Sequence, residues 1–116
     1  MKGSYCIAAF LTKDSEMEIG KLGIRRFPRG LYVYTGSALS SIENRLRRHL
    51  RKDKRKRWHI DYFLDAADII GFVAFLSPKK EECSINSMFL ERGEVIANGL
   101  GSSDCRCPSH LVFLGD

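Results

Sequence analysis

Residues 30–50 read GLYVYTGSALSSIENRLRRHL, a stretch in which a short strand passes through a glycine into an increasingly basic helix. Alternating aromatic and β-branched side chains predict a strand over residues 31–35, and Gly36 is expected to end it. Ser40, three residues before Glu43, gives a capping-box pattern, so a helix should begin at Ser40 or at the serine after it. The rest of the chain is expected to be organised around this strand–turn–helix unit.

The predicted helix separates an apolar stripe from a basic face. Ile42, Leu46 and Leu50 are spaced four residues apart and form the expected buried stripe. Arg45 and His49, also four apart, lie along its edge, where they could share a cleft floor with the second tyrosine of the preceding strand. The simpler alternative is that both side chains only extend around the edge of the core, with their polar ends in water.

The chain has 116 residues, of which 44% are apolar and 28% charged, as in one soluble globular domain spanning residues 1–116. The longest run without polar side chains, residues 69–76, is far shorter than the roughly 20 residues that cross a bilayer. Residues 1–12 contain one lysine and a short apolar run but no convincing signal-peptide cleavage site. The sequence therefore predicts neither a membrane segment nor secretion.

The net charge of +5 is concentrated in one segment. Residues 47–57 hold eight basic residues and one acid, Asp53, so this segment carries +7 and the remaining chain −2. Such a cluster attracts polyanions and releases their counterions, so nucleic acid is the expected partner, with a solvated charge run or anionic lipid as alternatives. The candidate nucleic-acid-binding residues, of which the first three are expected to face solvent from the helix, are Arg47, Arg48, Arg51, Lys52, Lys54, Arg55, Lys56 and Arg57.

The remaining segments have the patterns of strands and helices. They predict a buried central strand at 4–12, a hairpin at 17–26, a strand or short helix at 58–64, a buried strand at 69–77, a helix from 77 to about 92, and a last strand at 110–114.

The predicted helix after residue 77 has its own start signal and one notable acid. Ser77 and Pro78 have the residue types of a helix cap and a first helical residue. Its expected apolar face consists of Ile85, Met88 and Phe89. Helical spacing puts Glu82, and less closely Glu81, beside that face, where an acid needs an explanation.

Four motifs follow one another along the chain: Gly3-Ser4-Tyr5, Tyr34-Thr35-Gly36, Arg45 with His49, and an acid in a later helix. In this order they resemble the GIY-YIG nuclease superfamily. The blocks GLYVYTGSAL, RLRRHL, WHIDY, EEC and GSSDCRCPSHL look like the signature blocks of its small Uri-type endonuclease subgroup, and they span nearly the whole chain.

The resemblance implies a fold, a reaction and a set of site residues. The fold would be a small antiparallel sheet flanked by helices, and the reaction hydrolysis of phosphodiester bonds with one divalent metal ion, usually Mg²⁺ or Mn²⁺. Tyr5 and Tyr34 would be the motif tyrosines, Arg45 the motif arginine and Glu82 the metal ligand, with Glu81 as the alternative ligand.

These residue types suit phosphodiester hydrolysis. A fixed guanidinium, here Arg45, stabilises the negative charge that grows in the transition state. A single glutamate can anchor a hard dication that keeps most of its waters. A tyrosine near that charge can become acidic enough to take a proton from water. Tyr5 or Tyr34 is expected to be this base, with the two hydrogen-bonded to each other and His49 or His59 assisting.

The sequence departs from the family pattern in three ways. Ser4 and Thr35 stand where the motifs have isoleucine, both at strand positions where the change affects packing more than chemistry. The motif tyrosines are also further apart than is usual, so an extra hairpin at residues 17–26 is expected between their strands.

The four cysteines, Cys6, Cys83, Cys105 and Cys107, do not suggest a disulfide framework, because one residue separates the closest pair. A reducing cytoplasm is therefore the expected location. Cys105-x-Cys107-x-x-His110, with Cys83 as a possible fourth ligand, could bind zinc, but structural zinc usually uses paired Cys-x2-Cys motifs. We instead expect a small buried cysteine and a loop packed near the site.

Three further segments leave alternatives open. Asp104 and His110 could help to line the cleft. Trp58, His59 and Asp61 could contact nucleic acid or orient the site. Equally, Trp58 and the nearby Tyr62 could belong to the core while His59 and Asp61 pair at the surface.

The sequence thus predicts an α+β fold, a small, mainly antiparallel sheet flanked by helices, with an extra hairpin between the two motif strands. The expected function is a metal-dependent endonuclease whose partner is nucleic acid, with DNA as the expected polymer and no membrane. The alternatives are a catalytically silent nucleic-acid-binding domain of the same fold and a zinc-stabilised interaction module. The sequence leaves the oligomeric state open.

Overall fold

The computed structural model describes residues 3–38, 41–51, 53–77, 81–102 and 105–116. Along the chain these form β1 (Gly3–Leu11), β2 (Ser15–Glu18), a 3-10 turn η1 (Gly20–Leu22), β3 (Ile24–Phe27), β4 (Gly30–Ala38), α1 (Ile42–Leu50), α2 (His59–Ala66), β5 (Asp68–Leu76), α3 (Glu82–Leu90) and β6 (Leu111–Gly115).

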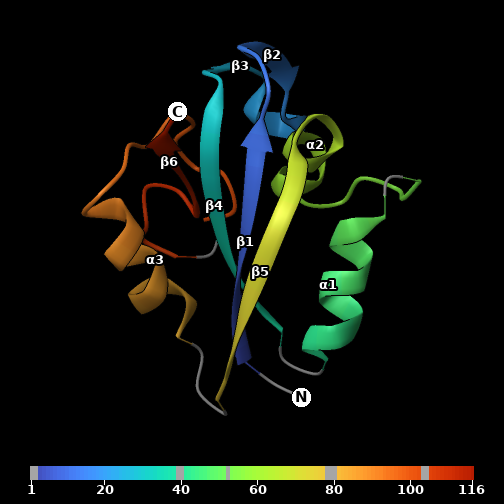
Figure 1. Ribbon diagram of the computed structural model, residues 1–116, viewed down its shortest axis with the longest axis vertical. Coiled ribbons are helices and arrows are strands. Elements are labelled where there is room, and N and C mark those ends of the chain that lie inside the picture. The colour runs from blue at the N-terminus through green and yellow to red at the C-terminus, as the bar shows by residue number, and fades with distance from the viewer. Residues whose placement is uncertain (1–2, 39–40, 52, 78–80, 103–104) are drawn as a thin grey trace.

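A four-stranded sheet in the order β5-β1-β4-β6 forms the framework, and each neighbouring pair is antiparallel (Figure 1). The predicted central strand is β1, whose Ile7 lies opposite Tyr34 of β4. Between these strands β2 and β3 make a separate hairpin, as the sequence predicted. The α+β class and the mainly antiparallel sheet flanked by helices are confirmed.

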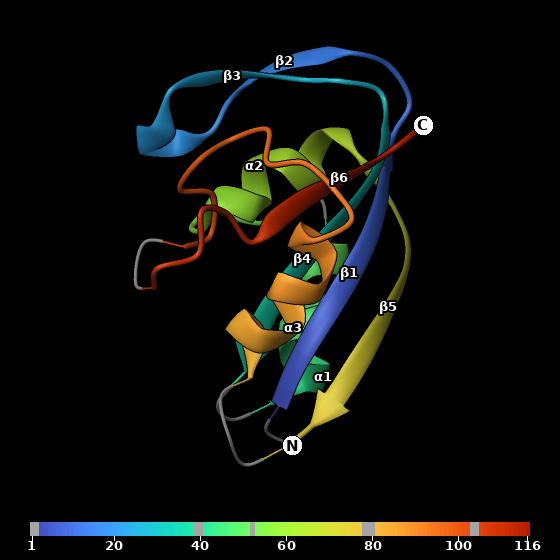
Figure 2. The same ribbon diagram turned by 90° about the vertical axis from the view of Figure 1, so that its left-hand side faces the viewer.

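The core lies on one side of the sheet, where the helices and the hairpin cover it. Figure 2 shows the helices to one side of β1 and β5, with α2 close to the β2–β3 hairpin. Phe27 of the hairpin, Tyr32 of β4 and Phe63 of α2 form an aromatic group with ring centroids 4.8–6.1 Å apart. This group is almost completely buried, so it fixes the hairpin against the main sheet.

The strand that the sequence placed at residues 31–35 is longer than expected. β4 continues through Gly36 to Ala38, so the prediction that Gly36 ends the strand is wrong. Gly36 lies opposite Tyr5 of β1, and a Cβ built on it would stand 2.6 Å from the Tyr5 hydroxyl. Glycine is therefore needed here to make room for that ring.

α1 begins where the capping pattern placed it but buries a different face. Ser41 caps the helix by accepting a hydrogen bond from the backbone N–H of Asn44, while Ser40 lies outside the described residues. His49 is 2% exposed and Leu50 is 50% exposed, so the helix turns its histidine, not its last leucine, toward the core. The predicted stripe is thus wrong at Leu50, and His49 lies deeper than the edge position expected for it.

β5 occupies the predicted position, but the expectation that it is buried is wrong. It is an edge strand, and its side chains are mostly exposed, including Ile70 at 62% and Leu76 at 57%. In Figure 2 the face of β1 and β5 that turns away from the helices is open. An unbroken apolar run is compatible with a two-sided buried strand, but here nothing among the described residues covers that outer face.

The two remaining helices and the last strand differ in detail from the predictions. Residues 58–64 adopt the helical alternative and form α2. α3 begins at Glu82 with Glu81 as its cap position, so Ser77 does not cap it, and Pro78 lies outside the described residues. The last strand, β6, covers residues 111–115 instead of 110–114.

The expected apolar face of α3 is wrong at Met88, while Ile85 and Phe89 are half-buried. Its fully buried residue is Asn86, whose side-chain amide donates to the Ser109 carbonyl at 2.7 Å, whereas Met88 is 65% exposed. No helix in the described parts of the chain has the length and apolar character needed to span a bilayer.

Candidate functional site

A cleft of about 380 Å³ opens where β1, β4 and all three helices meet. It is lined by Tyr5, Tyr34, Gly36, Ser37, Arg45, Arg57, Trp58, His59, Glu82 and Gly101. Residues far apart in the sequence therefore meet here, including nearly all the predicted catalytic residues and the predicted metal ligand. His49 does not line the cleft and reaches it through Tyr5.

Tyr5 and His49 form a buried pair at the back of the cleft. The Tyr5 hydroxyl lies 2.8 Å from His49 Nε2, and the two residues are only 1% and 2% exposed. Burial lowers the pKa of His49 to about 4, because the charged imidazolium is poorly solvated there. His49 is therefore neutral near pH 7, and its Nε2 can accept a hydrogen bond from the Tyr5 hydroxyl.

Tyr34 lies beside this pair, with its ring centroid 6.4 Å from that of Tyr5. Sequence reasoning expected the two tyrosines to bond each other, but the Tyr5 hydroxyl bonds His49 instead. Burial raises the pKa of Tyr5 to about 12 and raises the pKa of Tyr34 as well, although Arg45 opposes both shifts. The protein alone thus favours neutral phenols, and only added positive charge in the cleft would lower these pKa values.

Arg45 is held in place at the cleft wall by two contacts. Its guanidinium donates to the Ser37 carbonyl at 3.1 Å and lies 4.5 Å from the centre of the Trp58 ring. Arg48 lies over the same ring at 4.1 Å. A guanidinium held by a carbonyl and an aromatic ring keeps its remaining N–H groups in one direction, as anion binding requires.

Asp61 connects this wall to the fold, and an orienting role for it was only one of the alternatives that the sequence left open. Its side chain is fully buried and accepts hydrogen bonds from Arg48 at 2.9 Å and from the backbone N–H groups of Arg57 and Trp58. Burial opposes ionisation of the carboxyl group, but these donors hold its pKa below the ordinary value. The alternative in which His59 and Asp61 pair at the surface is therefore wrong.

His59 and Glu82 complete the cleft from opposite helices. His59 Nδ1 accepts the backbone N–H of Gly101 at 3.1 Å, so in the neutral ring the proton is on Nε2. Glu82 lies in the first turn of α3 and is the only carboxylate among the described residues that line the cleft. Glu81, the alternative ligand, is exposed and accepts a hydrogen bond from Ser77.

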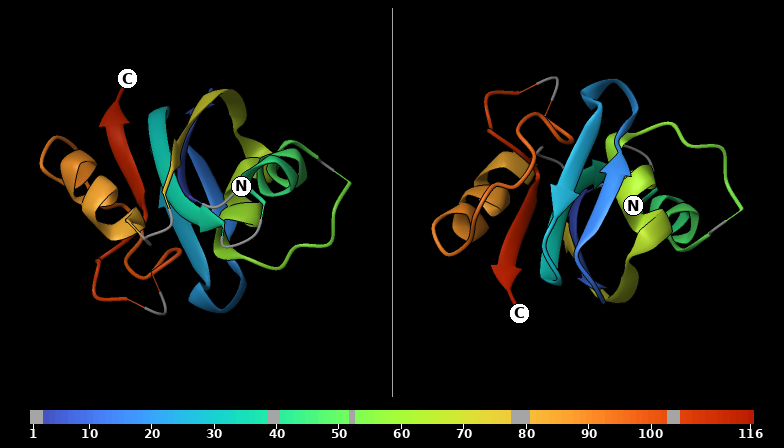
Figure 3. Two further views of the ribbon diagram at one scale, coloured as in Figure 1. Left: turned by 90° about the horizontal axis from the view of Figure 1, so that it is seen from below. Right: turned by 90° about the horizontal axis from the view of Figure 1, so that it is seen from above.

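The basic segment begins in the last turn of α1 and continues as a loop that extends away from the sheet between α1 and α2 (Figure 3). Two of its candidates are used inside the fold: Arg48 pairs with Asp61, and Lys54 donates to the carbonyls of His49 and Arg51. The exposed basic residues are Arg47, Arg51, Arg55, Lys56 and Arg57, while Lys52 lies outside the described residues.

This loop reaches the cleft itself. Arg57 lines the cleft, and it also lines an adjoining hollow of about 410 Å³ together with Arg51, Arg55 and Lys56. Exposed acids partly offset the charge, since Arg51 pairs with Asp53 and Lys56 with Asp65. The positive surface is thus continuous with the mouth of the cleft.

A second constellation, the Cys–His cluster, consists of Cys83, Cys105, Cys107 and His110. Its four ligand atoms lie within 4.8 Å of one another, so these residues could hold a metal ion. The expectation that the cysteines only pack near the site therefore underestimated them. His110 belongs to this cluster and does not line the cleft, and Asp104 lies outside the described residues.

Spacing gave only part of this cluster. Cys105, Cys107 and His110 are close in the sequence, but Cys83 comes from α3 and is brought to them by the packing of that helix on β4. For Asp61 the available signal was its position three residues after Trp58, which suits a carboxylate that accepts from backbone N–H groups at a helix start.

Comparisons with known proteins add the family. The search of curated proteins and the search of solved structures each found no match. A family model described as Domain of unknown function DUF123 matches residues 4–116, nearly the full length of the chain. On this match, the chain belongs to the DUF123 family.

Proposed function

We propose that this protein is a metal-dependent endonuclease that hydrolyses phosphodiester bonds in DNA. The observation that carries the proposal is the convergence of Tyr5, Tyr34, Arg45, His59 and Glu82 in one cleft at the edge of a basic surface. The resemblance of the motifs to the GIY-YIG nuclease superfamily supports the same reading, because the residues it names as functional are those that meet there.

Arg45 is the group that binds the scissile phosphate. A phosphodiester carries one negative charge and gains more in the transition state, so a guanidinium whose position is already fixed stabilises that state without reorganising. Ser37 and Trp58 fix it in this way. Arg57, also at the cleft, adds positive charge on the side where the chain of the polyanion would continue.

Tyr5 is the group that accepts a proton from the attacking water, and His49 positions it. The neutral His49 Nε2, 2.8 Å away, holds the Tyr5 hydroxyl in place, and the Tyr5 oxygen can take a proton from water once added positive charge in the cleft lowers its pKa. His59 can donate from Nε2, because its Nδ1 accepts from Gly101. Tyr34 contributes a neutral hydroxyl that can hydrogen-bond to a phosphate oxygen.

Glu82 fits a hard divalent cation, since an oxygen ligand in an open polar cleft leaves room for the waters that such an ion keeps. It would hold one Mg²⁺ or Mn²⁺, which when bound supplies positive charge that stabilises the leaving oxygen. The Cys–His cluster does not suit these ions, because they prefer oxygen to sulfur. We further propose a cytoplasmic location, because all four cysteines are free.

The test is cleavage of labelled single-stranded, duplex, nicked, flap and branched DNA, with matching RNA, in Mg²⁺, in Mn²⁺ and in chelator. We expect cutting that requires the metal and that Glu82→Ala abolishes while binding persists. Salt-sensitive binding without cutting by the wild-type protein in any metal would favour the catalytically silent nucleic-acid-binding domain instead.

A further inference from the structure

The Cys–His cluster has nearly the dimensions of a single tetrahedral zinc site. Zn–S distances of about 2.3 Å and Zn–N distances of about 2.0 Å place tetrahedral ligand atoms roughly 3.5–3.8 Å apart. His110 Nε2 lies 3.2 Å from Cys105 Sγ and 3.7 Å from Cys83 Sγ, and no pair of the four ligand atoms exceeds 4.8 Å. Shifts of about 1 Å or less would complete the tetrahedron.

His110 is oriented as a zinc-binding histidine is. Its Nδ1 lies 2.8 Å from the Thr35 carbonyl, and because a carbonyl only accepts, Nδ1 must carry the proton. Nε2 is then unprotonated and faces the sulfur atoms. Such a hydrogen bond from the second ring nitrogen to a backbone carbonyl is the usual way in which a zinc-bound histidine is held.

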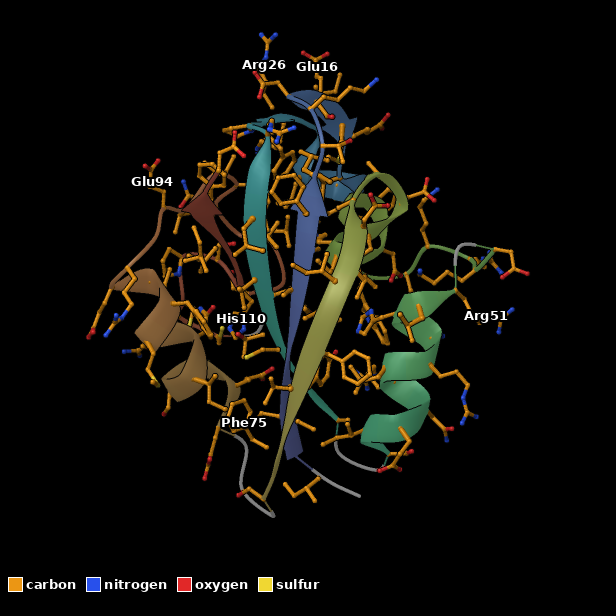
Figure 4. The ribbon with its side chains drawn as sticks, viewed as in Figure 1. Glu16, Arg26, Arg51, Phe75, Glu94 and His110 are labelled. Carbon is orange, nitrogen blue, oxygen red and sulfur yellow. The ribbon has the colours of Figure 1, made fainter. Side chains whose placement is uncertain are left out.

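The residues of the cluster come from separate parts of the chain. Cys83 lies in the first turn of α3, Cys105 and Cys107 lie in the loop before β6, and His110 is 1% exposed beside β4 (Figure 4). The His110 carbonyl also accepts a hydrogen bond from the backbone N–H of Thr35, so two hydrogen bonds fix His110 to β4.

We propose that the Cys–His cluster binds one zinc ion, and that this ion fixes the first turn of α3 against β4. Three thiolates and one imidazole make a closed set of four protein ligands, which is typical of structural zinc sites and leaves no position for substrate. Glu82 is adjacent to Cys83, so the same ion sets the position of the carboxylate in the cleft. Zinc binding itself does not depend on the proposed nuclease function.

The test is the metal content of the full chain, expressed with added zinc and purified without chelator. We expect about one zinc ion per chain, and after exchange with Co²⁺ the visible absorption of a tetrahedral cobalt–thiolate site. A protein that contains no zinc and gives no cobalt spectrum would overturn the proposal. Iron with sulfide in place of zinc would overturn it as well.

Variants separate metal binding from packing. Cys105→Ser should lower the zinc content to roughly a tenth and the midpoint of thermal unfolding by about 10 °C. Cys6→Ser is the control, because Cys6 is buried beside Thr35 but outside the cluster, and it should keep the zinc. Cys107→His should also keep it, since two cysteines and two histidines still make a zinc site. Equal zinc content in Cys105→Ser and the wild type would contradict the proposal even if both fold.

Discussion

Glu82 and Cys83 are neighbours in α3, yet their side chains belong to two sites of opposite chemistry. Glu82 lines an open cleft of about 380 Å³ with oxygen and nitrogen groups around it. Cys83 belongs to a closed group of three sulfur atoms and one nitrogen within 4.8 Å. The first arrangement suits a hard ion that exchanges with solvent, and the second suits a soft ion that stays bound.

Consecutive residues of β4 are likewise divided between the cleft and the Cys–His cluster. The Tyr34 side chain lines the cleft, whereas the Thr35 carbonyl accepts the hydrogen bond of His110 in the cluster. One strand and one helix therefore serve both sites. The cluster can therefore influence the geometry of the cleft without contacting any group in it, because it holds α3 in position against β4.

The largest effect should come from removing the carboxylate of the cleft. Glu82→Gln keeps the shape of the side chain and should reduce DNA cleavage at least about 10³-fold, with zinc content and unfolding midpoint unchanged. Glu81→Gln, at the exposed neighbouring position, is the matched control and should cleave like the wild type. If Glu82→Gln also lost zinc, the two sites would not be separable.

The next largest effect should come from Asp61, which supports the cleft but is not part of the Cys–His cluster. Asp61→Asn leaves Arg48 and two backbone N–H groups with a weaker acceptor and should lower the free energy of unfolding by about 3 kcal/mol. Urea denaturation measures this. Asp65→Asn in the same helix removes only an exposed pair with Lys56 and should change stability by less than about 0.5 kcal/mol. Unchanged zinc content in both variants would show that the cleft and the Cys–His cluster are stabilised independently.

A pH effect should report the buried His49. Its pKa falls from the ordinary 6.5 to about 4 in the folded protein, so its neutral form contributes stability that is fully present above pH 6.5 and is lost as the pH falls toward 4. The loss should be on the order of 2–3 kcal/mol. In His49→Gln the free energy of unfolding should change less between pH 6.5 and pH 4 than it does in the wild type. An unaltered pH dependence would show that His49 is not the group responsible.

The smallest effect should be on binding at the basic loop. Arg51→Glu with Arg55→Glu should weaken DNA binding roughly tenfold to a hundredfold and reduce its salt dependence. Arg25→Glu with Arg26→Glu makes the same charge change in β3 and is the control. Fluorescence anisotropy at several salt concentrations measures both. Equal weakening by the two pairs would indicate that only net charge matters.

The sequence predicted most of the fold because its main elements have strong local signals. A continuous apolar run gives β1, alternation gives β4, the cap at Ser41 gives the start of α1, and the glycines around η1 give the hairpin. The exposure of β5 could not be predicted in this way. An apolar run has the same composition whether another layer covers it or not, and the covering layer is a property of tertiary packing.

The candidate site was predictable in part, because spacing grouped Arg45 with Tyr34 and the resemblance added Tyr5 and Glu82. Tyr5, Arg45 and Glu82 do meet in one cleft. The burial of His49, the role of Asp61 and the closeness of Cys83 to His110 depend on how helices pack against the sheet. Such contacts join residues far apart in the sequence, so no spacing rule reveals them.

The bond between Arg48 and Asp61 has a further consequence for the basic loop. It joins residues 13 apart, so the exposed Arg51, Arg55 and Arg57 lie in a loop that is held at both ends and do not form a free tail. Part of the backbone entropy that a disordered basic segment loses on binding is here lost when the protein folds. The association rate constant for a polyanion should therefore be limited less by ordering of the loop after the first contact.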